Sequence, residues 1–259
     1  MVLAHDVEGS GPAVLLLHSG ATDRRMWEPL LPALGHAFTV VRPDLRGWGD
    51  SPLPGERYAD ADDLDELLAH LGIDHVRVVG SSMGGRVAME LATRHPGRVE
   101  ELVLLCAAYR GLETDDDAAE AFGTKEEELL EAGDVDGAVE LNVEQLLGPD
   151  ASDDARDQVR LMQRRAFEVQ LAADELDPPP QPERVEVDPA AIAVPTLVVS
   201  GGHDFAHFTA VADHLAATIP GAERLHLDWA GHLPSMERPD AVLALLLDTL
   251  RDDPDVHRP

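Results

Sequence analysis

The sequence predicts an α/β fold with a mostly parallel sheet, helices on both of its faces and a helical lid inserted into it. Two observations lead to this prediction. Short aliphatic runs alternate with segments of helical periodicity through most of the 259 residues, which is the pattern of parallel strands connected by helices. The alternation fails between residues 110 and 190, where the pattern is helical and contains no convincing strand.

The individual elements follow from their residue patterns. Residues 13–17 are almost all aliphatic, as expected of a strand buried on both faces. Residues 59–71 place four leucines at helical spacing, and Pro239 stands at the favourable first position of a last helix. The expected strands are 3–7, 13–17, 38–42, 76–79, 102–106, 196–200 and 222–227, and the expected helices are 59–71, 84–95, 207–219 and 239–250.

Segment 110–190 is expected to form a helical cap on a core made of residues 1–109 and 191–259. It holds 24 Asp and Glu against 7 Lys and Arg, so −17 of the net charge of −30 is concentrated there. Prolines at 178–180 and 182 make a stiff connector back to the core. The acidic runs at 115–117 and 126–128 are expected to be solvated rather than to bind a metal.

Composition excludes several classes of function. With 50 Asp and Glu against 20 Lys and Arg, the chain lacks the cationic face that nucleic acids and anionic membranes require. No apolar run is long enough to span a membrane, and residues 1–10 lack the order of a signal peptide. Cys106 is the only cysteine, which excludes an intrachain disulfide or a cysteine zinc site. We therefore expect a cytoplasmic protein, whose acidity fits either high salt or a biased genome composition.

The strongest chemical signal is the stretch Gly80-Ser81-Ser82-Met83-Gly84, which follows one expected strand and precedes an expected helix. A serine nucleophile needs a sharp turn that lifts its hydroxyl above the edge of the sheet, with small residues two positions away on each side. This spacing selects Ser82 rather than Ser81 as the candidate nucleophile. The helix that follows would direct its N-terminal amides at developing negative charge.

A serine hydroxyl needs a base, and the base needs a carboxylate that holds its tautomer. Among the 12 histidines, His232 stands in a loop after the last strand, where doubly wound sheets place their sites. Asp204 likewise follows a strand, and Asp228 is the alternative acid. The order Ser82, Asp204, His232 is that of one known class of serine triad. Three further histidines near the same loops are weaker candidates, namely His203, His207 and His214.

With these motifs the chain resembles the α/β-hydrolase fold superfamily, in particular serine hydrolases with a helical cap such as esterases and enol-lactonases. The resemblance covers residues 3–109 and 194–250. It includes His18-Ser19-Gly20, similar to the family's HG oxyanion segment, and residues 44–51, similar to its D-x-R-G-x-G-x-S stretch. The N-terminal part is too short for two leading antiparallel strands, so we expect about seven strands. Segment 110–190 falls at the usual position of the cap.

The resemblance also implies roles for individual residues. Two backbone amides would bind an oxyanion, those of Gly20 and Met83, with Ala21 as the alternative to Gly20. Structural roles are implied for three residues of the neighbouring loops, namely His18, Asp44 and Arg46.

The expected function is hydrolysis of a small ester or lactone through an acyl-enzyme, with no cofactor and no metal. The alternatives are an enol-lactonase or carbon–carbon bond hydrolase of the same fold and, from a different class, a non-hydrolytic receptor or a cofactor-free cyclase or lyase. A lactonase for an anionic ring would need a cationic anchor; Arg24 and Arg25 are the candidates, although surface positions are the simpler expectation. The side chains expected at the substrate pocket are Trp27, Trp48, Tyr109, Phe122, Met162, Phe167 and Phe205.

Overall fold

The structure, a computed structural model, describes residues 2–250 and is organised around a seven-stranded sheet. Its strands are β1 (His5–Gly9), β2 (Ala13–Leu17), β3 (Thr39–Pro43), β5 (Val76–Ser81), β6 (Val99–Leu105), β8 (Thr196–Gly201) and β9 (Glu223–Leu227). They lie in the order β1-β3-β2-β5-β6-β8-β9. Strand β1 is antiparallel to β3, and every other neighbouring pair is parallel. The expected mostly parallel sheet of about seven strands is therefore confirmed.

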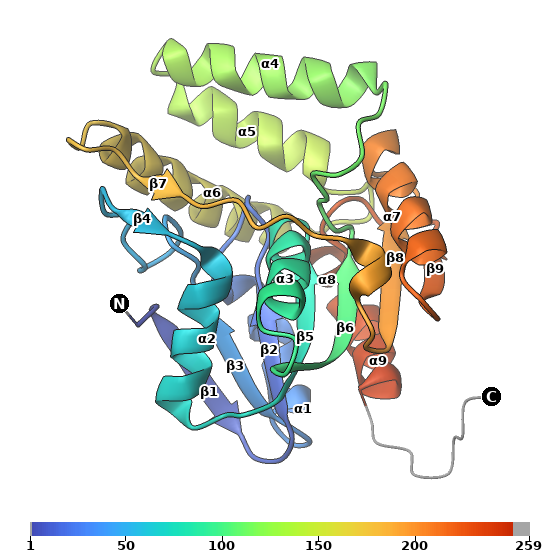
Figure 1. The fold of residues 1–259 in the computed structure, drawn as a ribbon. Coiled ribbons are helices and arrows are strands. Elements are labelled where there is room, and N and C mark those ends of the chain that lie inside the picture. The colour runs from blue at the N-terminus through green and yellow to red at the C-terminus, as the bar shows by residue number, and fades with distance from the viewer. Residues whose placement is uncertain (1, 251–259) are drawn as a thin grey trace.

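Helices cover both faces of this sheet because successive side chains of a strand point to opposite sides. One face carries α2 (Asp60–Leu71), α3 (Met83–Arg94) and α7 (Ala206–Thr218), and the other carries η1 (Arg24–Leu30), α1 (Leu31–Leu34) and α9 (Pro239–Thr249). In β2, Leu15 and Leu17 pack on the first face, whereas Val14 and Leu16 pack on the second. Figure 1 shows α2 and α3 in front of the strands.

Three helices between β6 and β8 stand over one end of the sheet, with α4 (Asp117–Glu131) and α5 (Val135–Leu146) uppermost and α6 (Asp153–Asp174) beneath them (Figure 1). The short elements η2 (Pro189–Ala191) and α8 (Pro234–Glu237) follow later in the chain. None of the helices formed by residues 2–250 combines the length and the apolar character needed to cross a membrane.

The connector that follows α6 contains a short strand that the sequence did not predict. Strand β7 (Gln181–Pro182) pairs in parallel with β4 (Arg57–Tyr58). The expectation of no strand within 110–190 is therefore wrong at this point. A two-residue strand has no detectable periodicity, and it forms only where tertiary packing brings two segments together. Here the N–H of Gln181 donates to the carbonyl of Glu56 at 3.0 Å, and the N–H of Glu183 donates to that of Tyr58 at 2.7 Å.

Two acidic side chains of the runs at 115–117 and 126–128 are not simply solvated. Asp116 caps α4 by accepting hydrogen bonds from two first-turn N–H groups, and its second oxygen accepts from the N–H of His207 in α7 at 2.7 Å. Glu126 accepts a hydrogen bond from the side-chain amide of Asn142 in α5. Both residues are half-buried rather than fully solvated, because the donors reach each carboxylate only when the elements pack together.

Candidate active site

Ser82 occupies the turn between β5 and α3 and has an unusual backbone conformation. Its φ of 51° and ψ of −113° are rare for a residue with a side chain. The glycines on both sides are required by close packing. A Cβ on Gly80 would lie 2.4 Å from the carbonyl oxygen of Gly84, and a Cβ on Gly84 would lie 2.3 Å from that of Leu17. The spacing of small residues around Ser82 therefore has a direct steric cause.

The structure brings the three predicted side chains into one hydrogen-bonded chain. The Oγ of Ser82 lies 2.7 Å from Nε2 of His232, and Nδ1 of His232 lies 2.8 Å from Oδ2 of Asp204. The other oxygen of Asp204 accepts from the N–H of Phe205 at 2.8 Å. With its proton on Nδ1, the imidazole donates to the carboxylate and accepts from the serine hydroxyl. This arrangement can remove a proton from Ser82 and stabilise the resulting imidazolium.

The alternative acid and the other histidines lie elsewhere. The side chain of Asp228 is 98% exposed and lies 3.6 Å from Nε2 of His226. His207 lines the pocket next to Ser82, but its Nδ1 is bonded to the hydroxyl of Thr114 at 2.6 Å. The remaining histidines of residues 2–250 do not line that pocket, namely His5, His18, His36, His70, His75, His95, His203, His214 and His226. His257 lies outside the described residues.

Gly20 and Met83, the two expected oxyanion donors, lie close together. A Cβ on Gly20 would be 3.8 Å from the Cβ of Met83. Within residues 2–250, neither backbone N–H has a protein acceptor. The N–H of Ala21, by contrast, donates to the hydroxyl of Ser19 at 3.3 Å, so the geometry favours Gly20 over Ala21. Trp48 was expected in the pocket, but its Nε1–H donates to the carbonyl of Gly20 at 2.7 Å and holds this loop.

Buried polar contacts hold the loops around this site. Nδ1 of His18 bonds the carbonyl of Ser19 at 2.8 Å, and its Nε2 accepts from the N–H of Leu45 at 2.9 Å. Burial lowers the pKa of His18, so the neutral ring is favoured. Asp44 accepts from the N–H of Asp50 at 2.8 Å. Arg46 donates to Asp63 at 2.7 Å. These contacts join neighbouring loops to one another and to α2 rather than face the pocket.

Arg24 and Arg25 are also committed to carboxylates. Arg24 pairs with Asp6 at 2.9 Å and Asp50 at 2.8 Å and also contacts Asp44. Arg25 pairs with Asp23 at 2.6 Å. Neither guanidinium lines the pocket that contains Ser82. The structure therefore places no cationic anchor for an anionic ring at these two positions.

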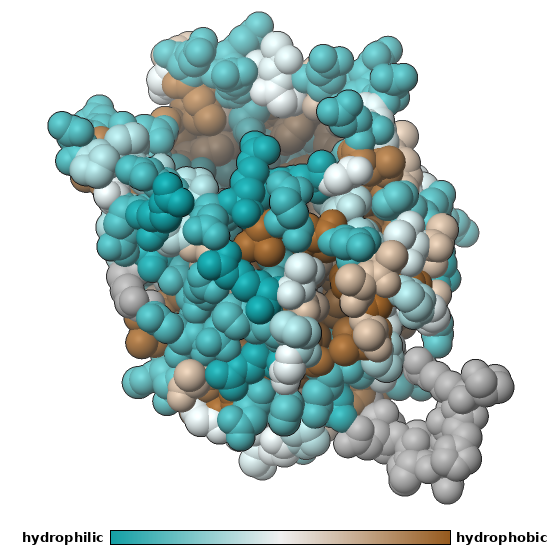
Figure 2. All heavy atoms as spheres, in the orientation of Figure 1, coloured by the Kyte–Doolittle hydropathy of each residue, from teal (hydrophilic) through white to brown (hydrophobic). Residues whose placement is uncertain are grey.

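A pocket of about 380 Å³ opens beside Ser82 and lies between the sheet and helices α4, α5 and α6. Figure 2 shows hydrophobic atoms in a recess beneath the uppermost helices. The apolar lining residues are Ala21, Ala119, Phe122, Leu146, Phe167, Phe205 and Phe208, and the polar residues away from Ser82 are Glu126, Asn142, Gln163, Gln170 and His207. Three of the expected pocket residues, Phe122, Phe167 and Phe205, are among them.

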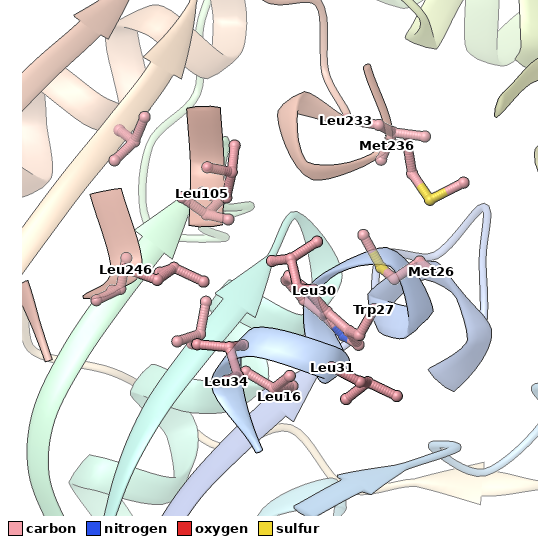
Figure 3. Packing of buried hydrophobic residues seen from close by; sticks show 14 of the residues in the cluster. Leu16, Met26, Trp27, Leu30, Leu31, Leu34, Leu105, Leu233, Met236 and Leu246 are labelled. Atoms are coloured by element: carbon pink, nitrogen blue, oxygen red, sulfur yellow. The ribbon is translucent and has the colours of Figure 1, made fainter. Parts of the chain in front are cut away.

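Three other residues that were expected at the pocket lie elsewhere in the structure. Trp27 is fully buried and belongs to the same core cluster as Leu16 and Leu31 (Figure 3). Met162 is 1% exposed and belongs to the same core cluster. The ring of Tyr109 stacks on His214 at 5.6 Å, away from the pocket. A large side chain suits a core as well as a pocket, and only the orientation of its helix or loop decides between them.

Phe208 is a pocket residue that sequence reasoning missed. Its ring centroid lies 4.1 Å from that of His232. Phe208 lies in the first turn of α7, three residues after the N-cap Phe205, so its spacing from Phe205 was the available signal. The aromatic contact packs one side of the imidazole and helps to hold its orientation.

Glu237 is a second missed residue, and it supports the loop that carries His232. Its carboxylate accepts from the N–H of Gly231 at 2.9 Å and from that of Leu233 at 3.2 Å, on the two sides of His232. The N–H of His232 itself donates to the carbonyl of Leu146 at the end of α5, at 2.8 Å. Burial raises the pKa of Glu237. The loop is thus held jointly by α8 and by the helices above the sheet.

We expect Glu237→Ala to lower both stability and catalysis. The change leaves two buried N–H groups without an acceptor, which costs about 2 kcal/mol in the free energy of unfolding. Displacement of His232 should also lower kcat by about tenfold or more. Glu237→Gln, which retains one acceptor oxygen, is the matched control and should lose less of both. Urea unfolding and ester kinetics on the three proteins measure these effects; an unchanged kcat in Glu237→Ala would show that the carboxylate only stabilises the fold.

Cys106 lies beside the same group. Its φ is 46°, and its Sγ lies within 4.8 Å of the facing atoms of Asp204 and His232. Such a trio has the spacing of a metal site, but two of its members already bond each other. Burial raises the pKa of the Cys106 thiol, which disfavours the thiolate that a metal would need. The chemistry of the donors therefore fits a hydrogen-bonded triad better than a metal centre.

The sheet order, the serine turn and the triad geometry define one class of fold, and comparison with known proteins agrees. A family model described as alpha/beta hydrolase fold matches residues 12–239. The chain belongs to the α/β-hydrolase family.

Among related sequences, a pimeloyl-[acyl-carrier protein] methyl ester esterase of Neisseria meningitidis serogroup B is 30% identical, over 91% of each chain. An uncharacterised protein of Mycobacterium tuberculosis is 40% identical over 107 residues, which are 40% of this chain and only 31% of that protein.

Among solved structures, the enol-lactonase from Burkholderia xenovorans LB400 superposes with a TM-score of 0.75 at 26% identity, over 96% of each chain. A thermophilic esterase from Thermogutta terrifontis has a TM-score of 0.74 at 28% identity, over 96% of this chain and 93% of that one.

Proposed function

We propose that the protein is a serine hydrolase that cleaves a small neutral ester or lactone through an acyl-enzyme. The observation that carries this proposal is the hydrogen-bonded chain from Ser82 to His232 to Asp204, with distances of 2.7 and 2.8 Å. It opens into a pocket of about 380 Å³. Full-length similarity to methyl ester esterases supports an ester as substrate.

In the proposed reaction, the Ser82 oxygen attacks the substrate carbonyl carbon while Nε2 of His232 takes the hydroxyl proton. The N–H groups of Gly20 and Met83 stabilise the negative charge that develops on the carbonyl oxygen. The tetrahedral intermediate expels the alcohol, which receives the proton from His232. Water, activated by the same imidazole, then attacks the acyl-enzyme and releases the acid and Ser82.

Helices α4 to α6 are proposed to act as the cap of this enzyme and to select its substrate. Of the residues that line the pocket, Phe122 comes from α4, Leu146 from α5 and Phe167 from α6. These side chains face a substrate whose carbonyl lies at Ser82. The division into a core of 1–109 and 191–259 with a cap of 110–190 is part of this proposal.

The charges around the pocket favour a neutral substrate. None of the described residues that line it is Lys or Arg, and Glu126 is its single carboxylate. Segment 110–190, to which Glu126 belongs, holds 24 acidic residues against 7 basic ones. We therefore expect kcat/KM for a simple aliphatic methyl ester to exceed that for the monomethyl ester of a dicarboxylic acid of equal length by about tenfold at low salt.

Steady-state kinetics of this ester pair at 0.01 M and 1 M salt test the proposal. The gap should narrow as the Debye length falls from about 30 Å to about 3 Å. Sustained turnover also separates a hydrolase from a receptor, which would release at most one equivalent of alcohol. If the anionic ester is preferred at low salt, the neutral-ester proposal is wrong and the enol-lactonase alternative replaces it.

A further inference from the structure

Gln163 is a buried polar side chain of the pocket whose hydrogen-bonding capacity is unused. It lies on α6 together with Phe167 and Gln170, at the spacing that places three residues on one helical face. The residue is only 4% exposed. Its Oε1 is buried without a hydrogen-bond partner, and no hydrogen bond joins its amide nitrogen to any of residues 2–250.

The side-chain amide nitrogens of Asn142 and Gln170, the two other amides of the pocket, already donate hydrogen bonds. Nδ2 of Asn142 donates to Glu126 and to the carbonyl of Ala138, the latter at 3.0 Å. Nε2 of Gln170 donates to the carbonyl of Gly47 at 3.3 Å. Gln163 therefore differs from its neighbours in that both ends of its amide remain available.

An unpaired buried amide is costly, and most such groups in folded proteins have a partner. A pocket that holds one is suited to a ligand that supplies the missing hydrogen bond. A site built in this way rejects analogues that lack the matching group far more strongly than an apolar pocket rejects an extra methylene.

We propose that Gln163 determines substrate specificity by binding an uncharged hydrogen-bonding group, such as a hydroxyl, keto or amide group, carried by the substrate away from the scissile carbonyl. This inference rests on the proposed function. An amide offers both a donor and an acceptor, so it matches such neutral groups. Glu126 in the same pocket disfavours an anionic group. Phe122, Phe167 and Phe205 provide apolar surface for the aliphatic remainder of the chain.

The test uses methyl esters of one straight-chain acid, unsubstituted or carrying a single keto or hydroxyl group at successive carbons. For the unmodified enzyme, kcat/KM for the best substituted ester should exceed that for the parent ester by about tenfold or more. In Gln163→Met, which retains the length of the side chain without its amide, the ratio should fall to about one. Gln158→Met, which removes an amide from the same helix outside this pocket, is the matched control and should keep the ratio of the unmodified enzyme.

The outcomes separate the two proposals. If no ester is turned over by the unmodified enzyme, the proposed function fails. If the parent ester is hydrolysed but no substituted ester is preferred, or if the preference survives in Gln163→Met, the role of Gln163 is overturned. Thermal unfolding of each variant shows that it is folded. If Gln163→Met does not fold, Gln163→Leu provides a second variant that lacks the amide.

Discussion

Ser82→Ala is expected to abolish hydrolysis of every ester that the enzyme accepts. The loss in kcat should be on the order of 10⁶, as when a serine protease loses its nucleophile. The reason is that the Oγ of Ser82, 2.7 Å from Nε2 of His232, would form the bond to the acyl group. The variant should also lose covalent labelling by a fluorophosphonate probe. Ester kinetics and gel detection of the label measure both effects.

Ser81→Ala is the matched control, because it removes the neighbouring hydroxyl. Ser81 is the last residue of β5 and fully buried, and its Oγ has no hydrogen-bond partner within the described residues. Removal of this hydroxyl therefore breaks no hydrogen bond within the described residues, and labelling of Ser81→Ala by the fluorophosphonate probe should persist. Labelling that persists in Ser82→Ala but disappears in Ser81→Ala would move the nucleophile to Ser81 and reject the proposed mechanism.

Asp204→Asn is expected to lower kcat by about 10⁴ while the protein stays folded. The amide keeps the shape of the carboxylate but can donate a hydrogen bond to Nδ1 of His232, which favours the wrong tautomer of the imidazole. It also removes the negative charge, 2.8 Å from Nδ1, that would stabilise the imidazolium. Kinetics on the neutral methyl ester, with circular dichroism to monitor folding, measure the effect.

Asp228→Asn is the control for the acid, since Asp228 was the alternative in the sequence. Its side chain is 98% exposed, so removal of its negative charge should change kcat by less than about twofold. A severe loss in Asp228→Asn together with a mild one in Asp204→Asn would assign the acid to Asp228 and contradict the geometry described above.

Local sequence was sufficient to predict the turn that carries Ser82 because its constraints are local. Gly80 and Gly84 leave room for backbone atoms that would lie 2.4 and 2.3 Å from a Cβ. The strand before the turn and the helix after it have their own residue periodicities. Chain order also predicted that Asp204 and His232 follow neighbouring strands, and parallel strands end at the same edge of a sheet. Their catalytic roles remain predictions for the variants above.

The residues that sequence reasoning missed depend on contacts between distant segments. Glu237 looks like an ordinary surface acid in the sequence, yet it is buried and accepts from N–H groups on both sides of His232. Gln163 stands in a polar stretch of α6, and only its burial against the other helices leaves its amide unpaired. Neither feature has a periodicity or a motif that could reveal it.

By itself, the sequence determined the α/β architecture, the approximate strands and helices, and the positions where reacting groups would meet. These depend on periodicity, turn chemistry and chain order, which operate over a few residues. Only the tertiary structure decided which large side chains face the substrate. It buried Trp27 and Met162 in the core and left Phe122, Phe167 and Phe205 at the pocket. The physical reason is that an aromatic or Met side chain gains from burial in either place, so the packing of its helix or loop makes the choice.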